Sequence, residues 1–321
     1  MKNTVVITFA NQKGGCSKTT STLNVAYCLA QTYKKKVLVL DLDSQASLSL
    51  DVGLDVDVED LNTIDQLLGA YVNREINEFK WDDVKNFIYT PTFSTRKKID
   101  GKWQNSEEEF GFDVIPSSTD LAMLDLQVAM RADENKGHKI YLYYIKDLID
   151  CIKANSDYDF ILADTAPALG SLTANAMAAS LTIIIPSNLE LMSFRGIHRI
   201  KDTVDFIQSS VQSQGLEHRG ILGILLSSYS LRRSVDKALE QYVHDFYPTP
   251  TFQTQIRDSS DARRAVAEGH LFAQINKKAR EDYDKACEEI MFALEDPEGW
   301  KKKADKVWNE VKKAREKEGN K

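Results

Sequence analysis

Near its start the sequence reads Val5-Val6-Ile7-Thr8-Phe9-Ala10-Asn11-Gln12-Lys13-Gly14-Gly15-Cys16-Ser17-Lys18-Thr19-Thr20. The first six of these residues form an apolar run that predicts a β-strand, and Thr19 to Thr32 have the apolar spacing of a helix. A strand, a glycine-containing loop and a helix in this order can form a phosphate cradle. Backbone N–H groups converge on the phosphate oxygens, and the positive end of the helix dipole favours their charge. The stretch therefore predicts a phosphate-binding loop.

Individual residues of this loop have the chemistry that phosphate and Mg²⁺ require. Lys18 can neutralise the β- and γ-phosphates, and the hydroxyl of Thr19 can bind Mg²⁺. The common pattern G-x-x-x-x-G-K-[ST] is not satisfied, because Gln12 and Ser17 occupy its glycine positions. A non-glycine residue at position 17 must fit the backbone of the loop. The predicted nucleotide-binding residues are Lys13, Gly14, Gly15, Cys16, Ser17, Lys18, Thr19 and Thr20.

Two later apolar runs end in carboxylates. One run leads to Asp41 and Asp43, and the other ends at Asp164. On an i, i+2 spacing, Asp41 and Asp43 are expected to leave the same side of an extended segment. A carboxylate at such a strand end can orient a water for attack on the γ-phosphate or bind Mg²⁺ through a water. Taken singly, each of these strand-end carboxylates could as well be a solvated loop residue or a helix cap as part of a nucleotide site. Only their combination with the phosphate loop points to a nucleotide site.

Short β-rich runs alternate with segments of helical periodicity along the chain. This alternation predicts an α/β fold with a mostly parallel, twisted sheet and helices on both faces. The predicted strands are Val5 to Ala10, Val37 to Asp41, Phe112 to Pro116, Phe160 to Asp164, Leu181 to Pro186 and Ile221 to Leu226. The predicted helices include Thr19 to Thr32, Asp120 to Met130, Ile140 to Ile152 and Phe194 to Gln212.

Two segments depart from this alternation. The polar stretch at 90–109 contains Pro91 and Gly101 and is predicted to be an inserted hairpin or loop. After residues 296–299 a new helix is predicted, with Trp300 and other apolar residues on one face and lysines on the others. We therefore expect a domain of residues 1–295 and a basic amphipathic C-terminal helix at 296–321.

The charge of this C-terminal helix leaves three roles open. Residues 300–321 contain nine basic and four acidic residues, a net charge of +5 against −12 for the rest of the chain. The helix can dock on the body with its basic face in solvent. It can contact DNA phosphates without reading bases. It can also lie on a membrane surface, which its tryptophans favour and its acidic residues oppose.

The overall composition limits the classes of function. The chain has 321 residues and a formal net charge of −7, so DNA binding requires a local basic face, because screening limits each charge to about 10 Å. Its four cysteines form no Cys-x-x-Cys pair, which argues against a zinc site or a disulfide framework. The first apolar run is too short for a secretion signal, and we expect a cytoplasmic protein.

The loop resembles the deviant phosphate loop K-G-G-x-x-K-[ST] of the ParA/MinD family of P-loop ATPases, in which a signature lysine, here Lys13, supplements the usual one. Asp41-Leu42-Asp43-Ser44-Gln45 is similar to the family's D-x-D-P-Q segment, with Ser44 in place of proline. By that match Asp43 would position the attacking water and Asp41 would support the metal. Asp164, at a Walker B position, would bind Mg²⁺ through a water. Lys13, Lys18 and Asp43 are the expected catalytic residues.

The resemblance covers roughly residues 3–295, interrupted by the insertion. Phe110 to Ser118 looks like the family's third strand and Pro-Ser motif, and Ile256 to Gly269 looks like the segment that holds the nucleotide base. Lys277, Lys278 and Arg280 lie where the family's DNA-contacting basic residues tend to occur. Nothing resembles an N-terminal helix-turn-helix domain.

In function, the resemblance implies an ATP-sandwich homodimer, in which Lys13 of one subunit reaches the phosphates bound by the other. Its expected cofactors are ATP and Mg²⁺. A ParA-type partitioning ATPase would bind DNA non-specifically, associate with the nucleoid and hydrolyse ATP when a centromere-binding, ParB-like protein stimulates it. The alternative is a MinD-like ATPase that cycles on a membrane through the C-terminal helix.

Overall fold

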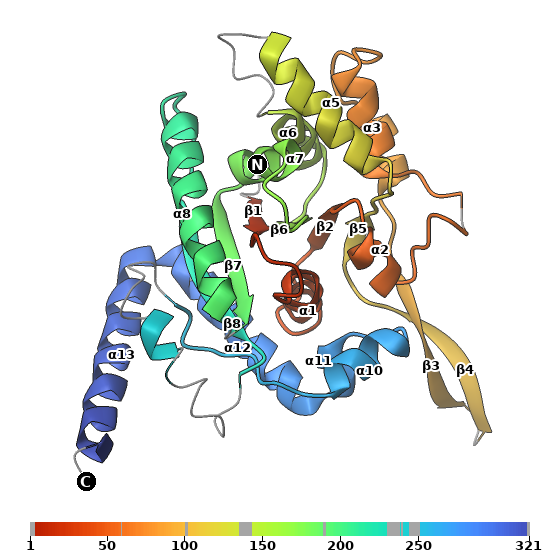
Figure 1. The fold of residues 1–321 in the computed structure, drawn as a ribbon. Helices are drawn as coiled ribbons and strands as arrows, with labels where there is room; N and C mark the ends of the chain where they lie inside the picture. Colours follow the sequence, from red (N-terminus) through yellow and green to blue (C-terminus); the bar gives the residue numbers. More distant parts are fainter. Residues whose placement is uncertain are drawn as a thin grey trace.

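The computed structural model of the chain describes residues 4–58, 60–99, 102–134, 143–188, 191–229, 238, 240–243 and 251–319. Its centre is a six-stranded sheet of order β5-β2-β6-β1-β7-β8, in which all neighbouring strands are parallel (Figure 1). The six predicted strands are confirmed. Their bounds are β1 (Val5–Phe9), β2 (Val37–Leu42), β5 (Asp113–Ile115), β6 (Phe160–Thr165), β7 (Thr182–Asn188) and β8 (Ile221–Ser227).

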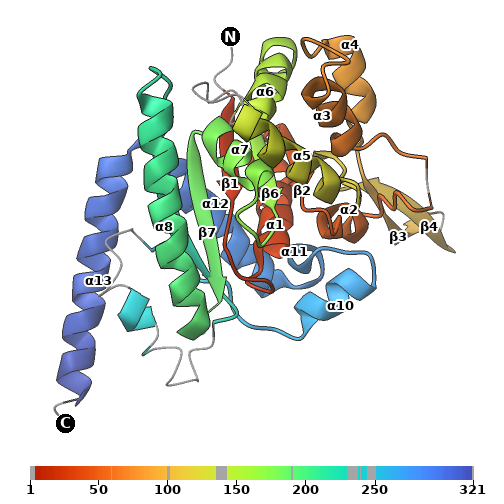
Figure 2. The ribbon, with the colours of Figure 1, turned by 45° about the horizontal axis from the view of Figure 1, so that its top comes forward.

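Helices cover both faces of this sheet (Figures 1 and 2). Successive residues of a strand point to opposite faces, so Ile7 packs in one hydrophobic cluster and its neighbour Val6 in another. Because both faces are buried, the strands are largely apolar, with polar residues such as Asp41 and Asp164 near their ends. One face carries α1 (Lys18–Gln31), α11 (Phe272–Ile275) and α12 (Lys277–Glu295). The other carries α3 (Ile64–Val72), α5 (Leu121–Glu134), α6 (Tyr144–Asn155), α7 (Ser171–Ala179) and α8 (Leu191–Gln212).

The four predicted helices correspond to α1, α5, α6 and α8. The first three residues of the segment predicted to begin at Ile140 lie outside the described residues, and α6 begins at Tyr144. The shorter helices are α2 (Ser47–Asp51), α4 (Trp81–Val84), the 3₁₀ helix η1 (Lys85–Phe87) and α10 (Asp261–Ala267).

The insertion at 90–109 is a hairpin, one of the two forms predicted for it. Strands β3 (Thr92–Ile99) and β4 (Lys102–Glu109) pair antiparallel and project from the body (Figures 1 and 2). Its base is fixed by Phe93, whose ring centroid lies 4.9 Å from that of the buried Phe110 and 5.7 Å from that of His270. Aromatic packing therefore joins the base of the hairpin to the body.

The predicted C-terminal tail forms α13 (Pro297–Gly319). The indole of Trp300 is buried, lies 5.2 Å from the ring of Phe252 and donates to Glu289 Oε1 at 2.9 Å. Ala304 is also buried, whereas the intervening residues 301–303 are exposed lysines. The first turns of α13 are therefore docked, and the amphipathic character of the rest of the tail stays a prediction. Within the described residues, none of the helices is both long and apolar enough to cross a membrane.

The buried His218 gives the fold a pH dependence that can be measured. Gly220 N donates to its Nδ1 at 3.0 Å, and its Nε2 lies 3.0 Å from Met177 O, so the ring must be neutral with its proton on Nε2. Burial lowers the pKa of His218 from its ordinary value. A lowered pKa means that this contribution to stability is present above about pH 6.5 and is lost as the pH falls below it.

We expect the free energy of unfolding of the wild type to fall between pH 7 and 5 relative to that of His218→Gln, by up to about 1.4 kcal/mol per pH unit. Urea unfolding at several pH values measures the free energy of unfolding of both proteins. The titration of groups that the two proteins share cancels in the difference between them. The exposed His198, substituted in the same way, is the matched control and should leave the slope unchanged. Parallel pH profiles for wild type and His218→Gln would contradict the assignment.

Candidate nucleotide-binding site

The predicted phosphate loop joins the end of β1 to the start of α1. Gly15 and Ser17 both have left-handed backbone conformations, with φ of 71° and 66°. Ser17 therefore adopts a conformation that favours glycine, which is why the common pattern has glycine there. A Cβ added to Gly14 or Gly15 would meet nothing within 4 Å, and the side chain of Ser17 makes no capping hydrogen bond to α1. The outer side of the loop is thus open, with the N-terminal N–H groups of the helix behind it.

Lys18 turns back into this loop. Its side chain is only 7% exposed, and its Nζ donates to Lys13 O at 3.4 Å. The ammonium group is therefore held beside the backbone that would surround a phosphate, which is the position that the sequence pattern predicts.

The end of β6 brings Asp164 against α1. Its Oδ2 accepts from Thr19 Oγ1 at 2.6 Å, and its Oδ1 accepts from Thr22 Oγ1 at 3.1 Å. Two residues that the sequence assigned to Mg²⁺, Thr19 and Asp164, are therefore in direct contact. Thr22 was missed in the sequence analysis, although its i+3 spacing from Thr19 places both on one face of the helix.

Asp41 and Asp43, at the end of β2, differ in burial and in hydrogen-bond partners. Asp41 is fully buried, its Oδ2 accepts from Ser49 N at 3.0 Å and Ser49 Oγ at 2.7 Å, and its Oδ1 accepts from Asp43 N at 3.1 Å. Asp43 is half-buried beyond the strand, and its Oδ1 accepts from Gln45 N at 3.0 Å. Asp41 thus anchors α2 and the loop that carries Asp43. Its role beside the metal stays a prediction.

The electrostatics of the site come from two buried carboxylates on neighbouring strands. Asp41 and Asp164 are paired in register on β2 and β6. Burial raises the pKa of Asp164 to about 7, and the neighbouring Asp41 contributes to the rise. Burial likewise raises the pKa of Asp41 to about 6, against the hydrogen bonds from Ser49 and Asp43 N. A cation beside these groups would favour their ionised forms.

This donor set fits Mg²⁺. Hydroxyl and carboxylate oxygens are its preferred ligands, and beside a nucleotide it needs only one or two carboxylates, with phosphates and waters completing the octahedron. Thr19 and Asp164 provide such a pair. Among the described residues there is no group of three or more His, Cys, Asp or Glu side chains that would hold a metal alone.

Lys13 lies on the opposite rim of the loop, near the end of β7. Its Nζ donates to Asn188 Oδ1 at 3.5 Å, and Asn188 Nδ2 donates to Gly15 O at 3.5 Å. Asn11 supports the same region, because its Oδ1 accepts from Lys13 N at 3.3 Å and its Nδ2 donates to Pro186 O at 2.7 Å. Neither asparagine was given a role from the sequence. Asn188 falls just beyond a predicted strand, at the sheet edge where such polar residues gather.

Cys16 faces inward from the same loop. It is only 1% exposed, and burial raises the pKa of its thiol. Burial therefore both shields the thiol from solvent and disfavours the reactive thiolate.

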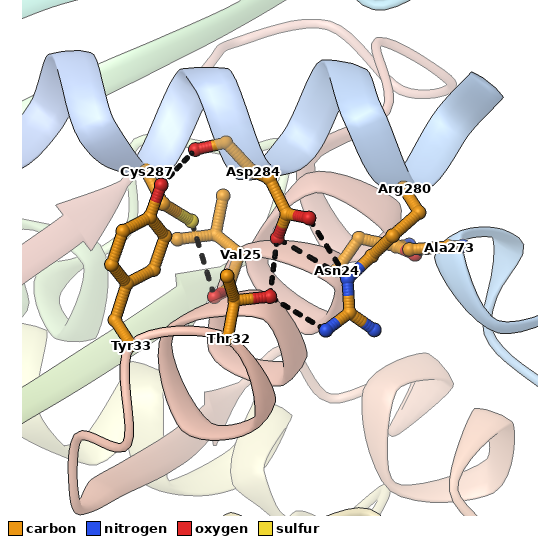
Figure 3. A network of polar contacts seen from close by, with 8 residues as sticks. All are labelled: Asn24, Val25, Thr32, Tyr33, Ala273, Arg280, Asp284 and Cys287. Carbon is orange, nitrogen blue, oxygen red and sulfur yellow. Dashed lines mark hydrogen bonds and ion pairs between the residues drawn. The ribbon is translucent and has the colours of Figure 1, made fainter. Parts of the chain in front are cut away.

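The predicted DNA-contacting residues divide into two groups. Lys277 and Lys278 are exposed at the start of α12. Arg280, by contrast, takes part in the network that packs α12 on α1 (Figure 3). Its Nη2 donates to Thr32 Oγ1 at 2.6 Å, its Nε donates to Asp284 at 3.2 Å, and its guanidinium lies 4.7 Å from the ring centroid of Tyr27. Only the two lysines are therefore free of this network, and their contact with DNA stays a prediction.

Comparison with known proteins adds a family match. Residues 4–217 match the family model described as an AAA domain. A ParA family protein of Chlamydia muridarum is 29% identical over 298 residues, which cover 92% of this chain and 100% of that protein. The chromosome partitioning protein ParA of Caulobacter vibrioides is 26% identical over 251 residues, which cover 78% of this chain and 79% of that protein.

Solved structures share the fold. A cobyrinic acid a,c-diamide synthase from Mycobacterium smegmatis, with bound ADP and magnesium, has a TM-score of 0.67 at 22% identity, covering 91% of this chain and 96% of its own. A plasmid partition protein from Borrelia burgdorferi has a TM-score of 0.53 at 20% identity, covering 86% of this chain and 99% of its own. At these identities the likeness concerns the fold alone.

Proposed function

Because this chain belongs to the ParA/MinD family of P-loop ATPases, within the AAA domain family, we propose that it is a Mg²⁺-dependent ATPase that partitions DNA. It forms an ATP-sandwich dimer, binds DNA without sequence preference and hydrolyses ATP on stimulation by a centromere-binding, ParB-like partner. It then works in the cytoplasm, on the nucleoid. The observation that carries the proposal is the meeting of Lys18, Thr19 and Asp164 at one edge of the sheet.

The geometry supports a division of roles in hydrolysis. The N–H groups of the open loop and Lys18 bind the triphosphate, and Thr19 with Asp164 holds Mg²⁺. When bound, Mg²⁺ supplies charge neutralisation at the β- and γ-phosphate oxygens. Asp43, the accessible carboxylate after β2, orients the attacking water, and Asp41 holds the loop of Asp43 in place. Catalysis of this kind depends mainly on positioning and electrostatics.

Lys13 is the residue that would couple nucleotide binding to dimerisation. It is half-buried on the rim of the loop, beside the exposed Gly14 and Gly15. A second subunit facing this edge would bring two sets of phosphates and carboxylates together, and the repulsion between them is relieved only by added positive charge. One signature lysine from each subunit provides that charge. ATP, which carries the γ-phosphate, then favours the dimer over the monomer.

The relatives support partitioning more than membrane positioning. The Caulobacter relative is named for chromosome partitioning. The MinD-like alternative would use the tryptophans of α13 at a membrane surface. Trp300, one of the two in that helix, is 1% exposed and packed against Phe252. The membrane alternative therefore loses one of its two anchors.

We expect ATP-dependent, salt-sensitive binding to duplex DNA. In gel-shift titrations the chain should bind with ATP and Mg²⁺ but not with ADP, and the affinity should fall steeply as salt is raised. Cosedimentation with anionic vesicles, run in parallel, should show little binding. ATP-dependent vesicle binding without DNA binding would discard partitioning in favour of the membrane-cycling alternative.

A further inference from the structure

Ser49 is a buried polar residue close to the loop that carries Asp43. It lies in the short helix α2, and its side chain is fully buried. Ser47, on the same helix, is exposed. A buried hydroxyl is costly unless it is hydrogen-bonded, so the partners of Ser49 indicate what the residue does.

The hydroxyl of Ser49 bonds to two segments that are distant in sequence. It donates to Asp41 Oδ2 at 2.7 Å and accepts from Ser117 N at 3.1 Å. The backbone N–H of Ser49 donates to the same Oδ2 at 3.0 Å. Because a hydroxyl has one hydrogen to donate and lone pairs to accept, this single group can satisfy both partners. Ser49 therefore joins the end of β2 to the chain that follows β5.

The segment that follows β5 is itself held in place. Ser117 is fully buried, and β5 pairs with β2 in the sheet. The carbonyl oxygen of the neighbouring Pro116 accepts from Ile64 N at 2.8 Å, which ties the segment to the start of α3. Ser49 thus connects the carboxylate of Asp41 to an anchored part of the fold.

The other oxygen of Asp41 holds the loop of Asp43. Asp41 Oδ1 accepts from Asp43 N at 3.1 Å, and Asp43 O accepts from Ala46 N at 2.8 Å. Ala46, the N-cap of α2, has a left-handed backbone with φ of 48°. Such a conformation is strained in a residue other than glycine and persists only where its surroundings hold it. Asp41, Asp43, Ala46 and Ser49 thus form a closed ring of contacts around the loop.

Removal of the Ser49 hydroxyl would open this ring at a defined point. Asp41 Oδ2 would keep its bond from Ser49 N but lose the shorter of its two hydrogen bonds, and Ser117 N would lose its acceptor. The two oxygens of a carboxylate turn together, so weaker restraint of Oδ2 also loosens Oδ1. The hydrogen bond that places Asp43 N would then be less well fixed.

We propose that Ser49 is a positioning residue for ATP hydrolysis, which acts through Asp41 on the loop of Asp43. The inference rests on the proposed function, in which Asp43 orients the attacking water. Orientation of a reacting group governs the chemical step, and a displacement of about 1 Å can cost about 100-fold in rate. Ser49 should therefore affect the rate of hydrolysis and leave the affinity for ATP almost unchanged.

The test uses the full chain with Mg²⁺ and compares Ser49→Ala with Ser47→Ala, a matched control that removes the same hydroxyl from an exposed position of α2. Ser49→Cys, which keeps the size of the side chain but is a weaker donor and acceptor, is a second variant in case the alanine variant folds poorly. Single-turnover hydrolysis, titration with a labelled ATP analogue and thermal melting are measured for each. Both alanine changes are also made in Asp43→Ala, which completes a double-mutant cycle.

Ser49→Ala should hydrolyse ATP about tenfold more slowly than the wild type and bind the ATP analogue within about twofold of it, because positioning and not binding is lost. Ser49→Cys should also be slower than the wild type. In the Asp43→Ala background, Ser49→Ala should slow hydrolysis by less than about twofold, since the group that it positions is already absent. A merely structural residue would lower the rate by the same factor in both backgrounds. Ser47→Ala should have no effect in either.

The inference is overturned, although the proposed function stands, if the wild type hydrolyses ATP and both Ser49 variants do so at the same rate. It is also overturned if Ser49→Ala weakens binding of the ATP analogue as much as it slows hydrolysis. An equal loss of rate in the wild-type and Asp43→Ala backgrounds would show that Ser49 does not act through Asp43. If the wild type neither binds nor hydrolyses ATP with Mg²⁺, the proposed function fails, and the role of Ser49 fails with it.

Discussion

The Asp43→Ala variant is expected to bind ATP and dimerise like the wild type but to hydrolyse ATP at least about 100-fold more slowly, because it loses the group that positions the attacking water. The fold should tolerate the change. The Asp43 backbone N–H that donates to Asp41 is retained, and the side chain gives up only its contact with Gln45 N. Single-turnover hydrolysis and nucleotide titration separate the two effects.

Asp57→Ala is the matched control, since Asp57 is an exposed carboxylate later in the same region and should leave turnover unchanged. Asp43→Asn keeps the shape of the side chain and should be nearly as slow as the alanine variant, because a neutral amide holds the water more weakly than a carboxylate does. Normal hydrolysis by Asp43→Ala would show that another group orients the water.

Lys18→Ala should lose nucleotide binding itself. The Lys18 ammonium is buried in the loop, where truncating one partner of a buried charge pair costs about 3 kcal/mol or more, equivalent to an affinity at least about 100-fold lower. Fluorescence titration with a labelled ATP analogue measures this loss. Lys285→Ala, at an exposed position of α12, removes the same charge outside the site and should bind normally. Wild-type affinity in Lys18→Ala would mean that the phosphates lie elsewhere.

Much of the fold could be predicted because its signals are local. Each of the six strands is a largely apolar run bounded by polar residues, because both of its faces are buried. The loop from Lys13 to Thr20 was predicted for a similar reason, since the strand, glycines and helix that define it are adjacent in sequence. For the insertion at 90–109, the sequence predicted either a hairpin or a loop, and the structure forms the hairpin.

The rest of the site depends on contacts between distant segments. Asp41 was placed with Asp43 by spacing alone, but its surroundings are set by Ser49, which a turn of α2 brings beneath it. Asn188 reaches Lys13 across 175 residues of sequence. In the sequence, nothing distinguishes Arg280 from a solvent-exposed arginine of a surface helix. Asp284 lies on the same helix, but Thr32 becomes a partner only when α12 docks on α1. Such long-range pairs leave no periodic signal in a single sequence.

Every role proposed for this chain requires that the loop after β1 bind a Mg²⁺-complexed adenine nucleotide, over which two subunits close. Titration calorimetry of the full chain with ATP, in Mg²⁺ and in excess chelator, tests it most directly. We expect saturable heat with close to one nucleotide per chain in Mg²⁺ and much weaker binding in chelator. The absence of any Mg²⁺-dependent uptake of ATP would contradict it.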